Sequence, residues 1–314
     1  MGAGARYLVT GGAGFIGSHL AAALLERGDA VRVLDDFSSG KPENLAGLAG
    51  DLEVRRGDLR DPAAVASAVA GCAGVFHAGA RPSVVESVAD PRLCYEVNFM
   101  GTVNVLEAAR RAGVRVVYSA SAAAYGDLPV LPKHEDAPLK PLSPYGAAKL
   151  AGEQALRASC HVHGLQGAVL RYFNVYGPRQ APDSPYSGVI ARFTRQLLSG
   201  EAPRIDGDGA QTRDFTYVAD VVRANLLAMQ ARLPRGAVLN IARGERVSVL
   251  ELFHALKRAL CSPLEPSFGP PRPGDVPHSQ ADIGRARDLL GYRPTVSLGE
   301  GIARTVAWYK ENTP

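Results

Sequence analysis

The stretch Val9-Thr10-Gly11-Gly12-Ala13-Gly14-Phe15-Ile16-Gly17 stands between an apolar run typical of a strand, residues 7–9, and an alanine- and leucine-rich segment typical of a helix, residues 18–27. Glycines in such a strand-to-helix turn let the backbone come close to a ligand. The helix N-terminus also presents free N–H groups and favours negative charge. The stretch therefore predicts a dinucleotide whose diphosphate contacts Gly11, Gly14, Phe15, Ile16 and Gly17.

An acidic pair follows the next predicted strand, residues 30–34. An acid about 20 residues after the glycines accepts hydrogen bonds from the adenosine ribose hydroxyls and repels a 2′-phosphate. Asp35 and Asp36 therefore indicate NAD rather than NADP as the cofactor. We expect the polar loop that follows to line the adenosine end of the site with Ser38 and Gly40.

The composition is that of an ordinary globular protein. The 314 residues are 46% hydrophobic and 21% charged, and the formal net charge of +4 gives no reason to expect a nucleic-acid partner. The four cysteines have no paired spacing, which predicts free thiols in a reducing compartment and neither disulfides nor a metal site. No apolar run reaches membrane length and no signal pattern begins the sequence, so the expected location is the cytoplasm.

Strand-like and helix-like segments alternate up to residue 175. Candidate strands at 52–54, 74–80, 114–118 and 167–171 are separated by candidate helices at 62–69, 91–112 and 145–163. Repeated units of this kind form a parallel, doubly wound α/β sheet. Beyond this point the alternation becomes irregular. We therefore expect a dinucleotide-binding domain over residues 1–175 and a smaller substrate lobe over residues 176–314.

Further candidates for the cofactor site lie where strands end. The small residues Ala78 and Ala80 leave room for a cofactor on the backbone. Asp58 either accepts a hydrogen bond from the adenine amino group or caps the helix at 62–69, and both readings stay open. His77 is expected to be a packed structural histidine rather than a base. The predicted cofactor set is completed by Leu59, Asn98 and Tyr172.

Tyr145 and Lys149 form the candidate catalytic pair. They are four residues apart at a predicted helix start, which puts them on one face. A nearby ammonium favours the phenolate and is expected to lower the pKa of the tyrosine, which then removes a proton from an alcohol as hydride leaves the same carbon. Lys149 also suits a hydrogen bond to the nicotinamide ribose. Ser121, at the end of the preceding strand, is placed to hydrogen-bond the reacting hydroxyl.

Several motifs of the chain resemble those of the extended short-chain dehydrogenase/reductase superfamily, and within it the NAD-dependent UDP-sugar 4-epimerases. They are the glycine turn, the acid at 35, Gly57-Asp58-Leu59, the serine strand, Tyr145-Gly-Ala-Ala-Lys149 and Arg171-Tyr-Phe-Asn174. The resemblance covers essentially the whole chain. It implies a Rossmann-type domain with a returning segment near 215–245, a smaller C-terminal α/β lobe, and an NAD that stays bound and is regenerated in each turnover.

The resemblance also implies substrate contacts for a UDP-sugar. Ser121 is implied to share the proton of the sugar 4-OH, and Asn174 to contact the diphosphate. Val189 lies in a stretch similar to a uracil-binding segment. Arg213 lies in a region similar to the family's diphosphate-binding arginine, and Arg272-Pro-Gly-Asp275 resembles a motif that holds phosphate and uridine ribose. Two guanidinium groups match the oxygens of a diphosphate.

Two alanines after Ser121 distinguish between reactions of this superfamily. Related dehydratases usually carry an Asp-Glu pair there, and decarboxylating relatives a glutamate. Here the positions are Ala122 and Ala123, whose methyl groups cannot move protons. C4 epimerisation of a UDP-hexose is therefore the favoured reaction. The chain also departs from the commoner epimerase pattern, because Ala120 and Ala123 stand where hydroxyl residues are frequent.

Ser279 bears on the choice of sugar. In similar epimerases the equivalent residue lies near the C2 group, and a serine leaves room for an N-acetyl group. We therefore expect UDP-GlcNAc/UDP-GalNAc to be accepted along with UDP-glucose/UDP-galactose. Relatives that act on UDP-glucuronate often have threonine at the position of Asn174, which argues against that substrate.

Two further expectations concern activity and assembly. A non-catalytic NAD-binding sensor is the alternative from another functional class, and the intact set of Ser121, Tyr145 and Lys149 argues against it. The helices at 91–112 and 145–163 resemble those that pair in the dimers of the family. A homodimer is therefore expected, although the apolar faces of these helices would serve equally well within a monomer.

Overall fold

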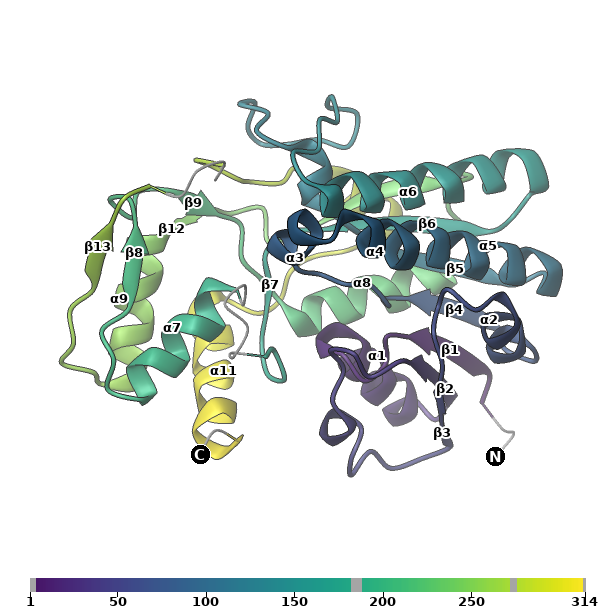
Figure 1. The fold of residues 1–314 in the computed structure, drawn as a ribbon, viewed down its shortest axis with the longest axis horizontal. Helices are drawn as coiled ribbons and strands as arrows, with labels where there is room; N and C mark the ends of the chain where they lie inside the picture. The colour runs from purple at the N-terminus through teal and green to yellow at the C-terminus, as the bar shows by residue number, and fades with distance from the viewer. Residues whose placement is uncertain (1–3, 182–187, 272–275, 313–314) are drawn as a thin grey trace.

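The centre of the molecule is a seven-stranded sheet (Figure 1). The computed structural model describes residues 4–181, 188–271 and 276–312. In spatial order the strands are β11 (Ala237–Ile241), β6 (Gly167–Tyr172), β5 (Arg115–Ser121), β4 (Gly74–His77), β1 (Arg6–Thr10), β2 (Ala30–Asp35) and β3 (Leu52–Arg56). All neighbours are parallel, so the predicted doubly wound α/β sheet is confirmed.

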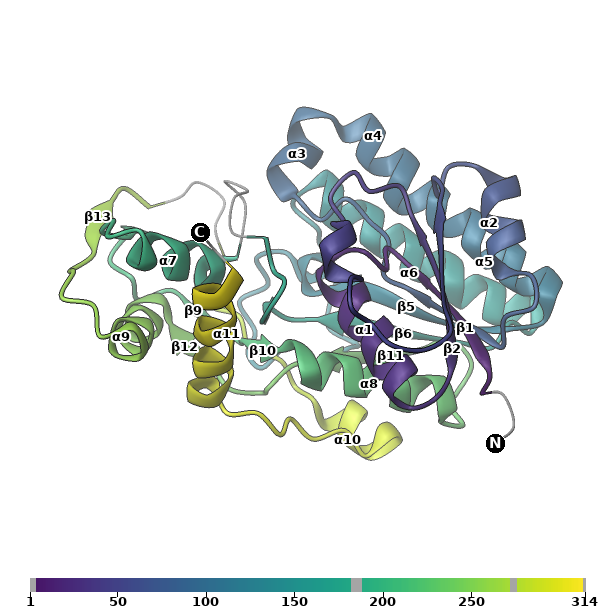
Figure 2. The ribbon, with the colours of Figure 1, turned by 90° about the horizontal axis from the view of Figure 1, so that it is seen from below.

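Helices cover both faces of this sheet (Figures 1 and 2). On one face lie α1 (Phe15–Glu26) and α8 (Val218–Gln230). The other face carries α2 (Pro62–Val69), α5 (Gly101–Ala112) and α6 (Pro144–His163). Strands covered on both sides need apolar residues on both faces, and β2 is accordingly buried along its whole length.

The direction of winding changes between β1 and β4. From β1 the chain moves outward through β2 to β3, and it then returns to β4 on the other side of β1. In open parallel sheets the crevice at the carboxyl ends of the strands, beside such a change, is where ligands bind. The glycine turn follows β1 and therefore lies at this crevice.

The predicted helix at 91–112 is interrupted. It is preceded by α3 (Val84–Ala89) and divided into α4 (Pro91–Tyr95), a π-helical turn η2 (Glu96–Met100) and α5. Asn98 lies in the π-helical turn, where its side chain accepts a hydrogen bond from Arg81 N (2.7 Å) and donates one to Arg81 O (3.0 Å). Such turns occur frequently at functional sites, and a periodic pattern of apolar residues does not reveal them.

Shorter elements form the remainder of the chain, much of it beside the sheet at the left of Figure 1. There α7 (Val189–Leu198), α9 (Val249–Leu260) and α11 (Leu298–Asn312) pack on one another. Three two-stranded pairs accompany them: β7 (Val175–Tyr176) with β10 (Thr216–Tyr217), β8 (Arg204–Asp206) with β13 (Ser267–Gly269), and β9 (Thr212–Arg213) with β12 (Val247–Ser248). The other elements are α10 (Gly284–Leu290) and the 3₁₀ turns η1 (Pro42–Asn44) and η3 (Ala122–Tyr125).

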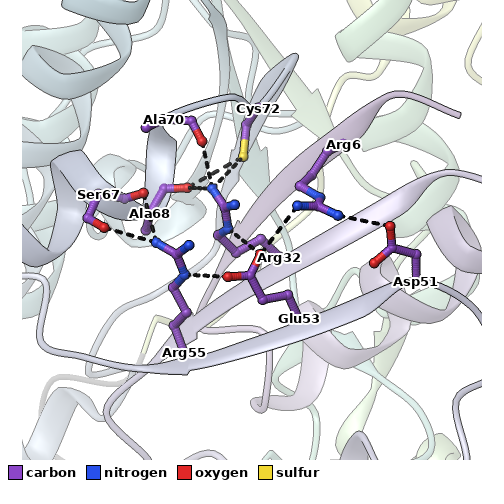
Figure 3. A network of polar contacts seen from close by, with 9 residues as sticks. All are labelled: Arg6, Arg32, Asp51, Glu53, Arg55, Ser67, Ala68, Ala70 and Cys72. Carbon is purple, nitrogen blue, oxygen red and sulfur yellow. Dashed lines mark hydrogen bonds and ion pairs between the residues drawn. The ribbon is translucent and has the colours of Figure 1, made fainter. Parts of the chain in front are cut away.

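A polar network joins β1, β2 and β3 to the end of α2 (Figure 3). Arg32 of β2 is buried, and its guanidinium donates to the carbonyl oxygens of Ala68 and Ala70, both at 2.7–2.8 Å. Because these carbonyls end α2, the positive charge lies where a helix dipole favours it. Glu53 of β3 accepts from Arg32 at 2.8 Å and from Arg55 at 2.6 Å, so the buried cation is paired.

Helix α6 begins and ends at clear signals and is tied to the sheet by a buried ion pair. Ser143 caps its first turn by accepting from Gly146 N (3.1 Å), and Gly164 ends it in the left-handed conformation. Within the helix, Glu153 accepts two hydrogen bonds from Arg171 of β6, at 2.6 and 2.8 Å. Both side chains are at most 1% exposed. The pair therefore fixes α6 against β6.

We expect Arg171→Met to destabilise the fold strongly, because it leaves the carboxylate of Glu153 buried without its cation. The free energy of unfolding in urea should fall by about 3–5 kcal/mol. Arg111→Met is the matched control, since Arg111 also pairs with a glutamate but is 74% exposed. The free energy of unfolding of the Arg111→Met variant should equal that of the wild type within the error of the measurement. Equal effects of the two substitutions would contradict the importance of the buried pair.

Candidate active site

A cavity opens at the carboxyl ends of β1, β2, β4 and β5, where the winding changes direction. The structure brings most of the predicted cofactor residues into its wall, although they come from distant parts of the sequence. They are Gly11, Gly14, Phe15, Ile16, Gly17, Asp35, Asp36, Ser38, Asp58, Leu59, Ala78, Ala80, Tyr145, Lys149 and Tyr172. Gly40 and Asn98 are the two predicted cofactor residues that do not line it.

The glycine turn has the geometry needed to hold a diphosphate. A Cβ at Gly17 would lie 2.1 Å from Gly11 O, and one at Gly11 would lie 2.6 Å from the Cα of Gly79. Gly14 is the N-cap residue of α1 and provides no side chain for the first-turn N–H groups, which include those of Phe15 and Ile16. These donors suit the oxygens of a diphosphate, so the turn fits the NAD that the sequence predicts.

Asp35 lies buried at the end of β2, with both oxygens already used by the backbone. Its Oδ2 accepts from Ala13 N (2.9 Å) and its Oδ1 from Phe37 N (2.8 Å). Burial raises the pKa of Asp35, and these two bonds oppose that rise. Each carboxylate oxygen has a further lone pair for a ribose hydroxyl. A Cβ at Gly40 would lie 2.9 Å from both oxygens, so Gly40 contributes by leaving room for this carboxylate.

Asp58 does not cap α2, so that reading of the sequence was wrong. Asp61 is the cap, because its Oδ1 accepts from Ala63 N (2.9 Å) and Ala64 N (3.3 Å). Asp58 instead lines the cavity and pairs with Arg60 at 2.6 Å. Hydrogen bonds from Arg60 hold the pKa of Asp58 below its usual value.

Asn98 and His77 do not line the cavity but lie buried next to it, each held by hydrogen bonds. Asn98 is buried and holds the backbone of Arg81, which does line the cavity. His77 is buried between the hydroxyls of Thr10 (2.7 Å) and Thr102 (2.9 Å). Burial lowers the pKa of His77 to about 3, so it is neutral. These contacts agree with a structural histidine rather than a base.

Ser121, Tyr145 and Lys149 meet where β5 ends and α6 begins. Tyr145 and Lys149 occupy successive turns of α6, and both line the cavity. Ser121 ends β5 and lies beside Tyr145, where it opposes the rise that burial causes in the tyrosine pKa. Its Oγ also accepts from Ala123 N (3.1 Å), which orients the serine at the start of η3. Lys149 Nζ donates to Ser119 O at 2.8 Å.

The expected lowering of the tyrosine pKa by Lys149 is not what this structure produces. Removal of the hydroxyl from water raises the pKa of Tyr145, and the hydrogen bond from Ser121 opposes that rise. Burial likewise lowers the pKa of Lys149 to about 8. Both shifts have one cause, because an apolar surrounding disfavours a charge on either group. The four-residue spacing predicts proximity, but it does not predict desolvation.

Other residues in the cavity wall were not predicted as cofactor contacts from the sequence. They are Leu34, Ser39, Gly57, Gly79, Arg81, Pro82, Val97, Ser119 and Ala120. Ser119 has a visible signal, because it stands two residues before Ser121 and so lies on the same face of β5. Its Oγ lies 3.0 Å from the Tyr172 hydroxyl, which also contacts Asn225 of α8.

The predicted substrate residues lie on separate elements outside that wall. Asn174 follows β6 and is exposed, and its backbone oxygen accepts from Thr216 N (3.1 Å). Val189 is the first residue of α7. Arg213 and Ser279 are brought together, because Ser279 N donates to Thr212 O at 3.0 Å. Arg272 and Asp275 lie outside the described residues.

Some kinds of site and segment are absent from the described parts of the chain. No group of three or more histidine, cysteine or acidic side chains is arranged to hold a metal ion within the described ranges. In those same ranges, no helix combines the length and apolar character needed to cross a membrane. All four cysteines are free thiols, and three of them are buried.

Comparison with known proteins identifies the family to which the chain belongs. Residues 7–242 match the model of the NAD dependent epimerase/dehydratase family. A UDP-glucose 4-epimerase of Mycolicibacterium smegmatis is 43% identical over 98% of this chain and 99% of its own length. The chain also matches decarboxylases, a UDP-glucuronate 4-epimerase and a 4,6-dehydratase, at 30–34% identity.

Solved structures of related proteins share the fold. A UDP-glucose 4-epimerase of Thermotoga maritima with UDP-glucose is 41% identical, with a TM-score of 0.93 over 98% of this chain and 100% of that one. A UDP-N-acetylglucosamine 4-epimerase of Methanobrevibacter ruminantium with UDP-N-acetylmuramic acid is 36% identical, with a TM-score of 0.95 over 99% of both chains. Two further matched structures contain NAD. The chain therefore belongs to the NAD-dependent epimerase/dehydratase family, and its cofactor is NAD.

Proposed function

We propose that this protein interconverts the C4 epimers of a UDP-hexose, UDP-glucose and UDP-galactose, while NAD stays bound. One observation carries the proposal: Tyr145 and Lys149 line the NAD cavity with Ser121 beside Tyr145, and the turn after Ser121 holds Ala122 and Ala123 in place of acids. The site thus has a group that exchanges a proton with a hydroxyl. At these two positions it has no group that removes water from the sugar.

The reaction we propose uses Tyr145 as the base. Although burial raises the pKa of Tyr145, the deprotonated fraction of its hydroxyl takes the proton from O4 of the sugar as a hydride leaves C4, and we assign Ser121 to share that proton. When bound, NAD would supply the group that accepts this hydride and gives it up again. Lys149 provides a buried positive charge one helical turn from Tyr145. The 4-keto sugar turns about its diphosphate link, so that C4 regains the hydride on its opposite face and Tyr145 returns the proton to O4.

Binding energy in this scheme comes from the UDP part of the substrate. The sugar has to turn between the two hydride transfers, so tight contacts to the hexose would slow the reaction. Arg213, together with the predicted Arg272, would bind the diphosphate, and Val189 the uracil. This division agrees with related structures, which hold UDP-glucose in one case and UDP-N-acetylmuramic acid in another.

The choice of sugar is proposed from Ser279. Its small side chain favours acceptance of UDP-GlcNAc and UDP-GalNAc in addition to the unmodified hexoses. Asn174 argues against UDP-glucuronate, the main alternative substrate. Dehydration or decarboxylation would need an acid in the turn after Ser121, where this chain has alanines. A sensor without catalysis would not need Tyr145 and Lys149 in the cavity wall with Ser121 beside them.

We also propose a homodimer in a reducing, cytoplasmic setting. Large apolar side chains that are exposed on or beside the expected dimer helices include Val88 (62%), Tyr95 (42%) and Met100 (48%). A second copy would cover them, because exposed apolar groups in one region favour association. Free thiols at all four cysteines suit a compartment in which disulfides do not form.

Tyr145→Phe should reduce epimerisation of UDP-galactose by about 10²–10⁴-fold, since it removes the hydroxyl that accepts the proton. The content of bound NAD should stay at the wild-type value. Tyr118→Phe is the matched control, because the buried Tyr118 hydroxyl donates to the backbone oxygen of Lys149 (3.1 Å) and Tyr118 does not line the cavity. Full activity of Tyr145→Phe would contradict the proposed base.

Ser279→Tyr should selectively remove activity on UDP-GlcNAc, because the larger ring would fill the space proposed for the N-acetyl group. The ratio of kcat/KM for UDP-GlcNAc to kcat/KM for UDP-glucose should fall by at least about tenfold, which corresponds to about 1.4 kcal/mol. Ser279→Ala serves as the control and should keep both activities. Equal loss on the two substrates would argue against this role for Ser279.

A further inference from the structure

The segment that carries Ser279 is hydrogen-bonded to other chain segments on both sides. On one side Ser279 N donates to Thr212 O (3.0 Å), next to Arg213. On the other side Lys133 N donates to Gln280 O (2.8 Å), and Asp282 N donates to Lys133 O (2.9 Å). The segment thus lies between the strand β9 and the loop that follows η3. Its position therefore determines where Ser279 lies relative to both Arg213 and Ser121.

Asp214 holds this arrangement together. It follows Arg213 directly and is 0% exposed. Its Oδ1 accepts from Arg243 N (3.0 Å), and its Oδ2 accepts from Gly244 N (3.0 Å) and Ala281 N (3.1 Å). One carboxylate therefore joins three segments that are far apart in the sequence. No side-chain cation pairs with it in the described parts of the chain, so its partners are backbone groups.

We propose that Asp214 is a positioning residue for substrate binding, which holds Arg213 and the Ser279 segment in the geometry that a UDP-sugar needs. The inference rests on the proposed function, because Arg213 and Ser279 are substrate residues only under that proposal. Asn at this position keeps the size of the side chain but replaces one acceptor oxygen by an NH₂ group. That group would face a backbone N–H, so at least one buried donor would lose its partner.

Asp220 provides a matched control in the same part of the molecule. It is also buried, at 2% exposure, and accepts from Thr295 N (2.9 Å), Thr295 Oγ1 (2.8 Å) and Val296 N (3.2 Å). It thus ties α8 to a distant segment in the way that Asp214 ties its partners. None of its partners is a predicted substrate residue. Asp220→Asn should therefore reproduce a loss of stability without a loss of substrate binding.

The test is calorimetric binding of UDP to the full-length, NAD-containing protein. Burial raises the pKa of Asp214 to about 7, so binding is measured at pH 8, where the carboxylate form predominates. Asp214→Asn should raise the Kd of UDP by about tenfold, because Arg213 is no longer held, whereas Asp220→Asn should leave Kd within about twofold of wild type. Equal Kd values for the two variants, with similar losses of Tm, would overturn the proposal.

A second measurement needs no variant and applies if Asp214→Asn does not fold. UDP binding to the wild type should slow amide hydrogen exchange at Gly244 and Ala281, which donate to Asp214, and leave Thr295 and Val296 unchanged. No slowing at the first two amides would contradict the positioning role. If the wild type bound UDP but did not epimerise UDP-sugars, the proposed reaction would be wrong and the role of Asp214 would still stand. Failure of the proposed reaction and failure of the positioning role are therefore distinguishable.

Discussion

The buried ion pair between Glu153 and Arg171 is the interaction on which the arrangement of the active site depends. Taking two charges out of water is costly, and the cost is offset only when the remaining donors and acceptors are satisfied. Arg171 meets this condition. Besides two bonds to Glu153, its guanidinium donates to the Tyr125 hydroxyl (2.8 Å) and to Glu135 O (3.0 Å). The pair thereby joins α6, β6 and the turn after Ser121.

The position of this ion pair links the stability of the fold to the geometry of the active site. Glu153 lies one turn after Lys149 on α6, and Arg171 directly precedes Tyr172, whose side chain lines the NAD cavity. Tyr125, which ends η3, donates to Asn240 of β11 at 2.7 Å. The helix with the proposed base and the strand that carries Tyr172 are therefore held by one network. Asp214 likewise ties together the elements that carry Arg213 and Ser279, by means of backbone donors.

The sequence predicts those features that depend on local chemistry. The glycine turn, the strand–helix alternation and the spacing of Tyr145 and Lys149 each follow from backbone geometry, and the fold that they predict was confirmed. The features that the sequence could not predict depend on contacts between residues that only folding brings together. The π-helical turn at Asn98 follows from contacts with Arg81, and the cap of α2 turned out to be Asp61. The pKa of Tyr145 rises because the folded protein desolvates it, which no spacing reveals. The roles of the site residues remain predictions.

In the proposed reaction one hydride leaves C4 and returns to it, with no net redox change and no loss of water. The most direct measurement follows UDP-galactose that carries deuterium at C4, by NMR and mass spectrometry, while NADH absorbance is recorded. UDP-glucose should form with the label retained at C4 and without accumulation of NADH. Loss of the label to solvent, a product lighter by one water, or stoichiometric NADH would contradict the proposed reaction.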